Sequence, residues 1–371
     1  MEKIQQLEPY NLKEIVITIP ARNEEKTILK TLESIKTQEP VDKEFLVIVF
    51  CNGCSDDTVN LCNQFKSTNP TFPIEILISN EDFINNVGIA RKILMDYASN
   101  KIKGTGWIIM TDADTVFHSS WLAAYNELLE TNFDLICGVI IPQTDNLSTL
   151  QLKYLKLTRT YLEYVAKLQR ELYAIDIEGG PDHSHNSGPN MAIRGKVYKK
   201  IGGIPPLACL EDIALYNRVL ESGLRIKHSH SPISFTSARI NSRVRGGFGD
   251  ELRNVENCIS KKVEGVQGLI SKFEAMSEIK DRYQKRDYYD LEALSSKLCI
   301  SSAKLKDLFS TYKTYQGINL QIDRYLQSNK DWNYKYPKIQ LEEAIGQFDY
   351  YYRFSQTTIS YNSERYIDRN L

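Results

Sequence analysis

Short apolar runs alternate with longer amphipathic stretches along residues 1–140. The runs resemble strands buried on both faces and lie at 15–19, 45–50, 74–78, 107–110 and 135–141. Between the runs, apolar residues recur at helical spacing, as Ile28, Leu32 and Ile35 do. This alternation predicts an α/β fold with a mostly parallel, Rossmann-like sheet flanked by helices. Ligands of such sheets bind beyond the carboxyl ends of the strands.

The pattern changes in the later part of the chain. Residues 150–173 form a helical stretch whose apolar stripe is interrupted by polar residues, which favours docking against the protein over lying on a membrane. Another strand–helix pattern runs from 191 to 235. Beyond 251 the strand signals vanish, and about four or five helices are expected, with turns near Gly317 and around 332–337. The chain is therefore predicted to hold one domain at residues 1–250 and a helical C-terminal region at residues 251–371.

Composition narrows the class of protein. The 371 residues include 46 basic and 47 acidic side chains, and this near-zero balance rules out a broad nucleic-acid surface as the default interpretation. No apolar run approaches the roughly 20 residues that span a bilayer, and the charged N-terminus lacks the apolar core of a secretory signal. Seven scattered cysteines do not resemble a disulfide framework. The sequence predicts a soluble, cytoplasmic protein with reduced thiols.

Polar side chains follow the predicted strands, where the chemistry of such a sheet is expected. The segments are Pro20–Glu25, Cys51–Thr58, Asp112–Asp114 and the Glu211–Asp212 pair at a helix start. Two carboxylates separated by one residue can hold a hard divalent cation, which in turn binds phosphate oxygens. An isolated Asp-x-Asp triplet is more often a helix cap. Here, however, an apolar strand delivers the triplet to the ligand-binding edge of the sheet.

Taken in order, these segments resemble a known family. The runs VITIPARNEEKTILKTLESI, VIVFCNGCSDDT, NNVGIARKILMDYA, WIIMTDADT, NSGPNMAIRGKVYKKIGG and LEDIALYNRVLESG are similar to the family 2 glycosyltransferases of the GT-A fold, and they cover about residues 14–250. The resemblance implies a nucleotide-sugar-binding and catalytic domain of GT-A type. It also implies transfer of a sugar from a nucleotide-diphosphate donor to an acceptor hydroxyl, usually with inversion and with Mg²⁺ or Mn²⁺.

The resemblance assigns donor and metal contacts to particular residues. It implies donor binding by Pro20, Glu24 and Arg91. It implies that Asp112 faces ribose and metal, and that Asp114 is the metal ligand.

The resemblance also assigns the catalytic and sugar-binding roles. Asp212 of the Glu211–Asp212 pair matches the general base, which takes the proton of the attacking hydroxyl. Helix capping is the alternative role for this pair. The loop at Gly188, Pro189 and Asn190 is expected to face the acceptor and the sugar, because small residues let a sugar ring approach the backbone.

The chain departs from the family in the second loop. Family members carry an Asp that reads the nucleotide base where this chain has Cys51. A thiol cannot reproduce a carboxylate's acceptance of a base N–H, so Asn52 or the backbone is expected to substitute. The Cys51–Cys54 pair lacks a second pair at zinc spacing, so no zinc site is expected.

Basic residues and a histidine in the later segment are further candidates. Arg243 and Arg245, which follow Arg239, are candidate donor ligands because the family places a basic residue against the diphosphate; a solvated loop explains the run equally well. His228 and His230 share one face of a strand, and the resemblance makes His228 a candidate metal ligand, with strand packing as the alternative.

Three functions are weighed. The leading one is a non-processive glycosyltransferase, because the Gln-x-x-Arg-Trp motif and membrane helices of processive synthases are absent. A nucleotidyltransferase of related fold needs a Gly-rich basic loop where this chain has PARNEE. A non-catalytic nucleotide-sugar-binding or scaffold protein is expected to have lost the Asp pair or Asp212, and both are present. The expected partners are a nucleotide-diphospho-sugar donor and a glycan, lipid-linked or small-molecule acceptor, with peripheral membrane contact left open.

Overall fold

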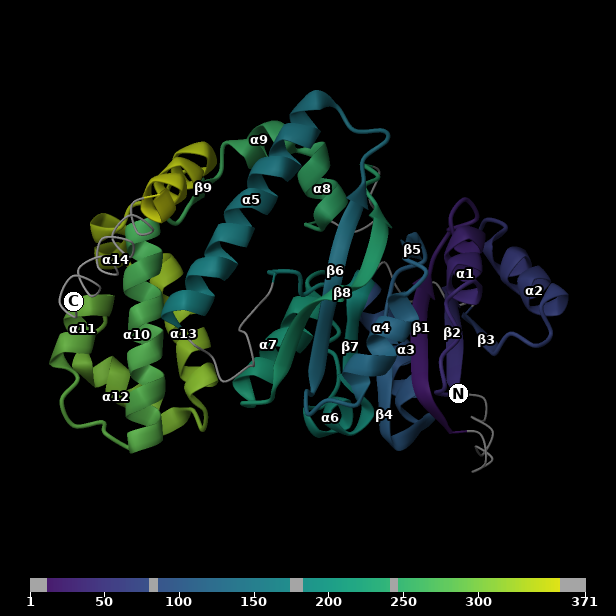
Figure 1. Cartoon of the computed structure of the whole chain (residues 1–371), viewed down its shortest axis with the longest axis horizontal. Coiled ribbons are helices and arrows are strands. Elements are labelled where there is room, and N and C mark those ends of the chain that lie inside the picture. The colour runs from purple at the N-terminus through teal and green to yellow at the C-terminus, as the bar shows by residue number, and fades with distance from the viewer. Residues whose placement is uncertain (1–11, 80–85, 174–182, 241–245, 354–371) are drawn as a thin grey trace, which may run out of the picture. The chain divides into compact units, whose positions relative to one another are not determined.

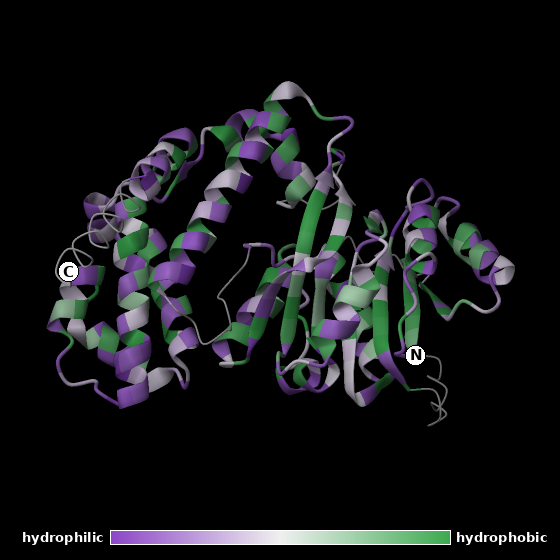
Figure 2. Ribbon diagram, in the orientation of Figure 1, coloured by the Kyte–Doolittle hydropathy of each residue, from purple (hydrophilic) through white to green (hydrophobic). Residues whose placement is uncertain are grey.

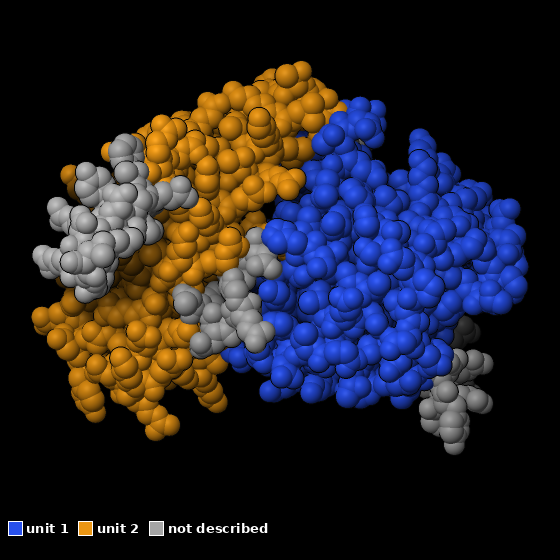
Figure 3. Space-filling view, in the orientation of Figure 1, with its two compact units in different colours: residues 1–146, 185–253 blue, residues 147–184, 254–371 orange. Residues whose placement is uncertain are grey.

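The chain forms two compact units. The structure is a computed structural model that describes residues 12–79, 86–173, 183–240 and 246–353. Unit 1 consists of residues 1–146 and 185–253, and unit 2 consists of residues 147–184 and 254–371 (Figure 3). Unit 1 is continued across an excursion of the chain into unit 2, so each unit is built from two segments.

Unit 1 is an α/β unit whose elements follow the alternation read from the sequence (Figure 1). Its first segment contains β1 (Lys13–Ala21), α1 (Ile28–Lys36), β2 (Phe45–Asn52), α2 (Thr58–Thr68), β3 (Ile74–Ser79), α3 (Val87–Ser99), β4 (Ile102–Met110), β5 (Thr115–Phe117), α4 (Trp121–Leu129) and β6 (Leu135–Gln143). Its second segment contains the 3₁₀ helix η1 (Gly188–Asn190), β7 (Met191–Arg194), α6 (Gly195–Lys200), α7 (Glu211–Glu221), β8 (Ile226–Ser237) and α8 (Phe248–Arg253).

Eight strands form one sheet in the order β3-β2-β1-β4-β7-β6-β8-β5. β1, β2, β3 and β4 run parallel, and so do β6 and β8. β7 is antiparallel to both β4 and β6, and β5 is antiparallel to β8. The predicted α/β fold with a mostly parallel sheet flanked by helices is confirmed, with β7 and β5 as the antiparallel exceptions.

The central strands are buried because both of their faces are covered. Ile15, Ile17 and Ile48 are fully buried, and Figure 2 shows the apolar colour running along β1 and β6. α1 packs against α2, and α3 packs against β1 and α6. Since the chain steps from β1 to β3 in one direction and returns to β4 in the other, right-handed crossovers put α3 on the face opposite α1 and α2. Burial on both faces explains why these strands read as continuous apolar runs.

Unit 2 is predominantly helical. It contains α5 (Thr149–Leu172), α9 (Val255–Ile259), β9 (Lys262–Val263), α10 (Val266–Lys285), α11 (Glu292–Leu298), α12 (Ser302–Thr311), α13 (Tyr315–Ser328), α14 (Lys330–Lys335) and β10 (Ile339–Gln340), and residues 341–353 are also helical. One core of buried side chains joins α5 to the later helices, for example through Leu168, Phe273 and Ile318. The helical character predicted for the tail is confirmed.

Several details of unit 2 differ from the sequence-based expectation. The tail has more helices than the four or five expected, because α9 and α14 are too short to show periodicity. It also holds a two-stranded ladder, with Val263 opposite Ile339. Gly317 lies inside α13 and Trp332 inside α14, so the breaks between helices fall beside the expected turns.

The 150–173 stretch belongs to unit 2. Tyr154, Tyr161 and Leu168 of α5 are buried, as docking of this helix against the protein requires. The helix packs against α10, whereas a boundary at residue 250 assigns it to the first domain. Compactness does not show that either part folds alone, so the division into domains stays a prediction.

Two further sequence-based expectations concern membranes and thiols. Across the described ranges, the helices are all too short or too polar to cross a bilayer. All seven cysteines are free thiols.

One buried amide joins η1 to three other elements of unit 1. Asn190 is fully buried, and its Oδ1 accepts hydrogen bonds from Trp121 Nε1 (2.8 Å) and Tyr125 Oη (2.9 Å) on α4. Its Nδ2 donates to the backbone carbonyls of Val139 (2.8 Å) and Pro232 (3.0 Å) on β6 and β8. The amide thus uses both acceptor and both donor capacities. It holds in place the loop that carries Gly188.

Replacing Asn190 with Ala is expected to lower the free energy of unfolding by about 3 kcal/mol. The change leaves four buried polar groups without their partner, and each such group costs about 1–3 kcal/mol where water and relaxation do not compensate. Urea unfolding followed by circular dichroism measures this. Asn60→Ala is the control, because Asn60 is exposed and donates to nearby Asp57. Equal stability of the two variants contradicts the prediction.

Candidate active site

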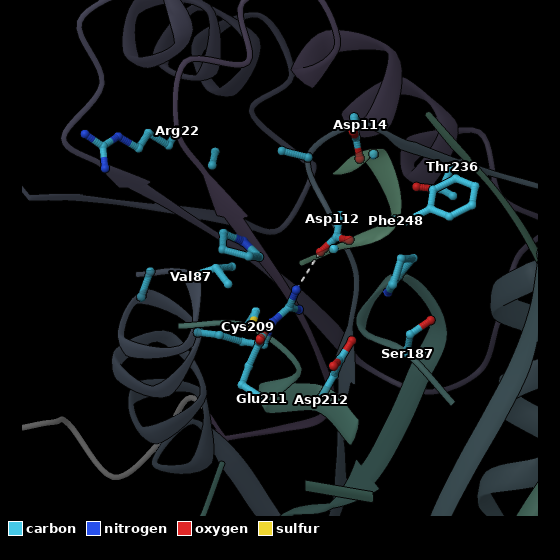
Figure 4. A pocket seen from close by; sticks show the side chains of 18 of the residues that line it. Arg22, Val87, Asp112, Asp114, Ser187, Cys209, Glu211, Asp212, Thr236 and Phe248 are labelled. Atoms are coloured by element: carbon cyan, nitrogen blue, oxygen red, sulfur yellow. Dashed lines mark hydrogen bonds and ion pairs between the residues drawn. The ribbon is translucent and has the colours of Figure 1, made fainter. Parts of the chain in front are cut away.

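A cavity of about 590 Å³ opens in unit 1 beyond the carboxyl ends of β1, β2 and β4. Its lining comes from the loops after these strands, the start of α3, the loop before η1, the start of α7 and the segment after β8. The volume lies within the roughly 300–1,000 Å³ range of small-molecule sites. The edge of the sheet where ligands were expected is therefore hollowed, and Figure 4 shows the side chains that line it.

The first loop places a buried carboxylate beside the cavity. Pro20 lies at the end of β1 and lines the cavity together with Glu24. The Glu24 side chain is 7% exposed, and its backbone N–H donates to Thr58 Oγ1 over 2.7 Å. The loop turns through Asn23, whose φ of 54° lies in the left-handed region, where asparagine is tolerated better than most residues. The tight turn directs Glu24 back toward the sheet.

The second loop presents Asn52 and conceals Cys51. Cys51 is fully buried, whereas Asn52 lines the cavity. Successive side chains of a strand face opposite sides, so only one of the two can reach the ligand. Asn52 is 5% exposed, and its Oδ1 is buried without a hydrogen-bond partner among the residues that the structure describes. An orphaned acceptor at a cavity wall is available to a donor group of a ligand.

A buried guanidinium joins the Asp-x-Asp triplet to the Glu-Asp pair. Arg91, on α3, is 3% exposed. Its Nη2 donates to Asp112 Oδ1 (2.7 Å, the dashed line in Figure 4), and its Nε donates to Glu211 Oε1 (2.9 Å). Burial lowers the pKa of Arg91, but the carboxylates of Asp112, Glu211 and Asp212 outweigh burial and raise it. Burial raises the pKa of Glu211 despite the opposing charge of Arg91.

A second guanidinium bridges the first loop and the triplet. Arg239 lies just after β8, and its Nη1 donates to Glu24 Oε2 over 2.7 Å. Its Nη2 lies 3.1 Å from Asp114 Oδ2. The Asp114 side chain is 12% exposed, and burial raises its pKa to about 7; Arg239 opposes this rise, whereas Asp112 and Glu24 add to it. The two carboxylates of the triplet thus pair with different arginines.

Asp212 is held by backbone donors at the start of α7. Its Oδ2 accepts from Gly188 N–H (2.7 Å) and its Oδ1 accepts from Ile213 N–H (2.8 Å). Leu210, the residue before the pair, has φ 58°, which is strained for a leucine. These constraints fix the direction of the Asp212 carboxylate, which Figure 4 shows beside Glu211.

Gly188 is required by the close approach of Arg91. A Cβ built on Gly188 lies 2.7 Å from Arg91 Nη2, closer than real Cβ contacts come. The backbone of this loop therefore covers the guanidinium while donating to Asp212. Pro189 lines the cavity next to it.

Several candidates from the sequence lie elsewhere. Asn190 is turned into the interior, where its amide braces the loop and does not face the cavity. His228 is buried on β8, and its Nε2 is 3.1 Å from Tyr216 Oη on α7. It does not belong to the described residues that line the cavity. Arg243 and Arg245 lie outside the described residues. Cys209 and Phe248, which the sequence reading did not single out, line the cavity.

The carboxylates fit a divalent cation only with help from a ligand. Mg²⁺ and Mn²⁺ sites in nucleotide-binding proteins typically use one or two carboxylates together with phosphate oxygens and water. Asp112 and Asp114 supply two such carboxylates at the cavity. Across the described part of the chain, no three His, Cys, Asp or Glu side chains cluster closely enough to hold an ion alone. Phosphate oxygens of a ligand have to complete such a site.

The fold and cavity define an α/β protein with an acidic, arginine-braced site at its strand ends. The model of the glycosyl transferase family 2 matches residues 16–202, which is half of the chain. The chain therefore belongs to glycosyl transferase family 2, and the resemblance read from the sequence is confirmed. This assignment favours glycosyl transfer over the nucleotidyltransferase alternative. The match ends before Asp212 and Arg239, so the family model does not test their roles.

The chain is similar in structure to several known glycosyltransferases. No curated protein matches the sequence. A mannosyltransferase from Pyrobaculum calidifontis in complex with GDP-Man and Mn²⁺ is similar over 88% of this chain and 84% of its own, with 14% identity and a TM-score of 0.45. S. aureus TarS 1–349 with UDP-GlcNAc is similar over 85% and 91%, with 12% identity and a TM-score of 0.45. GalNAc-T7 with UDP, GalNAc and Mn²⁺ is similar over 86% and 58%, with 12% identity and a TM-score of 0.47.

Replacing Gly188 with Ala is expected to lower turnover by about 10²-fold, because a methyl group displaces the Arg91 guanidinium and small displacements at a site cost about that much. Steady-state kinetics on a responsive donor and acceptor measures this. Gly104→Ala is the matched control, since nothing lies within 4 Å of the added Cβ. Unchanged turnover in the Gly188 variant contradicts the positioning role of this contact.

Proposed function

We propose that the protein transfers a sugar from a nucleotide-diphosphate donor to an acceptor hydroxyl, with inversion and without processivity. One observation carries the proposal: a single cavity brings together Asp112 and Asp114, the buried Arg91, and the oriented carboxylate of Asp212. Donor binding, cation binding and proton transfer need these three kinds of group within one site. Membership of glycosyl transferase family 2 supports the reaction class.

The donor occupies the wall formed by β1, β2 and α3. Asn52 Oδ1, a buried acceptor without a partner in the described residues, accepts an N–H of the base. Arg91 Nη1, a buried donor likewise without a partner there, binds a donor oxygen. Pro20 and Glu24 border the same wall, and Asp112 faces the ribose. An amide in place of a carboxylate keeps the acceptor while removing a charge, which distinguishes this base site from the family pattern.

Asp114, assisted by Asp112, is the protein's ligand for Mg²⁺ or Mn²⁺. When bound, the cation stabilises the negative charge that develops on the departing diphosphate. Arg91 holds Asp112 through a 2.7 Å ion pair, so this carboxylate is oriented before any ligand arrives. Such preorganisation avoids the cost of ordering the site during the reaction.

Asp212 accepts the proton of the attacking hydroxyl. Each oxygen of its carboxylate takes one backbone N–H, and a carboxylate oxygen has a second lone pair that is left for the proton. Inversion requires a base on the side of the sugar away from the leaving group, and Figure 4 shows Asp114 and Asp212 at opposite ends of the group of carboxylates. Gly188 and Pro189 form the wall beside Asp212, where the sugar and acceptor bind.

The proposal is tested first by thermal unfolding of the protein with a panel of nucleotide sugars in the presence of Mn²⁺. A donor at about 100 times its dissociation constant adds about 2.7 kcal/mol of stability. The expected result is stabilisation by one class of nucleotide diphospho-sugar, and product formation with that donor confirms the reaction. Failure of every nucleotide to stabilise the protein contradicts the proposal.

Replacing Asp114 with Asn is expected to abolish the dependence of donor affinity on Mn²⁺. The amide keeps the shape of the side chain but supplies a neutral and weaker metal ligand. Calorimetry of the responsive nucleotide diphosphate, with Mn²⁺ and with EDTA, measures the dependence. Wild-type protein with equal affinity in both buffers contradicts the metal site, as does a variant that keeps the full Mn²⁺ effect.

Replacing Asp212 with Asn is expected to lower turnover by about 10²–10⁴-fold, the usual contribution of a general base, while donor affinity stays nearly unchanged. Kinetics and calorimetry on the same preparation separate the two effects. Asp96→Asn serves as a control, because Asp96 pairs with Lys92 and Tyr198 away from the cavity lining. Collapse of donor affinity shows that Asp212 is a binding or folding residue, and full turnover shows that the base lies elsewhere.

A further inference from the structure

Arg239 contacts Asp114, the carboxylate that the proposed function assigns to the cation. Its guanidinium reaches Glu24 from the first loop and Asp114 from the triplet, with 2.7 Å to Glu24 Oε2 and 3.1 Å to Asp114 Oδ2. The Arg239 side chain is 35% exposed, whereas the Glu24 and Asp114 side chains are 7% and 12% exposed. The cationic partner of these buried carboxylates is thus the member of the group nearest to solvent, and the one that can leave.

A divalent cation and this guanidinium repel each other at Asp114. In proteins, Mg²⁺ binds carboxylate oxygens at about 2.0–2.1 Å. Arg239 Nη2 lies only 3.1 Å from Oδ2 of the same carboxylate, so the two positive groups face each other across one carboxylate. Like charges at such separations repel more strongly when they are partly buried than in water. The guanidinium therefore weakens the binding of a cation to Asp114.

We propose that Arg239 is a displaceable occupant of the cation site, which keeps metal affinity low until a diphosphate binds. The inference rests on the proposed function, because it takes Asp114 as the metal ligand. A diphosphate supplies oxygens that complete the coordination of the cation, and it supplies negative charge to which the released guanidinium moves. Metal and donor consequently bind together, and Arg239 is a positioning residue that couples the two events.

The arrangement has a simpler alternative, in which Arg239 only neutralises the buried Glu24. The two roles differ in their effect on a bare metal ion. A competitor for Asp114 weakens Mn²⁺ binding in the absence of any phosphate, whereas a partner of Glu24 alone leaves it unchanged. If diphosphate displaces Arg239 from Asp114, the displacement has to account for part of the increase in metal affinity that diphosphate causes.

The experiment measures the Mn²⁺ affinity of the full-length protein by the electron paramagnetic resonance signal of free Mn²⁺. Titrations are run with Mn²⁺ alone and with inorganic pyrophosphate, and a protein-free titration subtracts the ion that pyrophosphate binds. Arg239→Gln is expected to bind Mn²⁺ alone about tenfold more tightly than wild type, which corresponds to about 1.4 kcal/mol. Pyrophosphate is expected to strengthen Mn²⁺ binding less in this variant than in wild type.

Three further variants make the result specific. Arg239→Lys keeps a positive charge at the position and is expected to bind Mn²⁺ about as weakly as wild type. Arg159→Gln removes an exposed arginine–carboxylate pair of α5, with Glu163 at 2.8 Å, and is expected to change nothing. If Arg239→Gln does not fold, as judged by thermal unfolding, the double variant Glu24→Gln/Arg239→Gln, which also removes the buried charge, takes its place.

Two results overturn the proposal in distinguishable ways. In the first, Arg239→Gln binds Mn²⁺ no more tightly than wild type, while Asp114→Asn weakens Mn²⁺ binding both in wild type and in Arg239→Gln. The metal site then stands, and Arg239 does not compete for it. If Asp114→Asn leaves Mn²⁺ affinity unchanged in both backgrounds, the metal part of the proposed function fails, and the competition fails with it.

Discussion

The site depends on a guanidinium buried between two loops that are far apart in the sequence. Arg91 pairs with Asp112 at the end of β4 and with Glu211 at the start of α7, 120 residues away along the chain. A buried cation is tolerated only when it is paired and hydrogen-bonded. The two ion pairs therefore supply the buried Arg91 and Glu211 with partners of opposite charge, and they join the end of β4 to the segment that carries Asp212.

Helix α3 has to be placed accurately for this contact to form. Asn86 caps the helix by accepting from the backbone N–H groups of Gly88 and Ile89, which fixes where the helix begins. A Cβ on Gly88 comes within 2.0 Å of the carbonyl of Leu207, so only glycine lets the helix approach the loop that leads into α7. Cap and glycine together bring Arg91 to Glu211. Local sequence choices in α3 thus decide a tertiary ion pair.

The sequence was sufficient to predict the helices and strands with strong periodicity. It was insufficient to predict the contacts between them. β1, β2 and α1 were placed within a few residues, because continuous β-branched runs and an i, i+4, i+7 stripe leave little ambiguity. β5 was missed, since its three residues are too few to show a period. The assignment of α5 to unit 2 could not be predicted from the apolar stripe of this helix, because such a stripe indicates that one face is buried but not which element covers it.

The same limit applied to the candidate site. Residues at strand ends line the cavity where the topology of the sheet alone brings them together, as for Glu24, Asp112 and Asp114, while their roles stay predictions. Asn190 looked like part of a sugar-facing loop because Gly and Pro precede it, yet its direction is decided by four partners on other elements. Arg239 pairs with Glu24 across 215 residues, and no spacing in the sequence encodes such a pair. Long-range pairing of charges has no local signature.

The charges of the residues that line the cavity favour the binding of a cation. Among the described lining residues, five carboxylates face three guanidinium groups, and Figure 4 shows Arg22 directed away from the carboxylates. A diphosphate that enters this acidic cavity meets net repulsion. Burial, to which Asp112 and Glu24 add, raises the pKa of Asp114 to about 7 although Arg239 opposes the rise. The carboxylates cannot be replaced by neutral side chains to reduce this repulsion, because Asp112 and Glu211 hold Arg91 in place. In the proposed function, a cation that arrives with the donor and leaves with the diphosphate balances the excess negative charge, which permits turnover where a permanent positive charge retains the product.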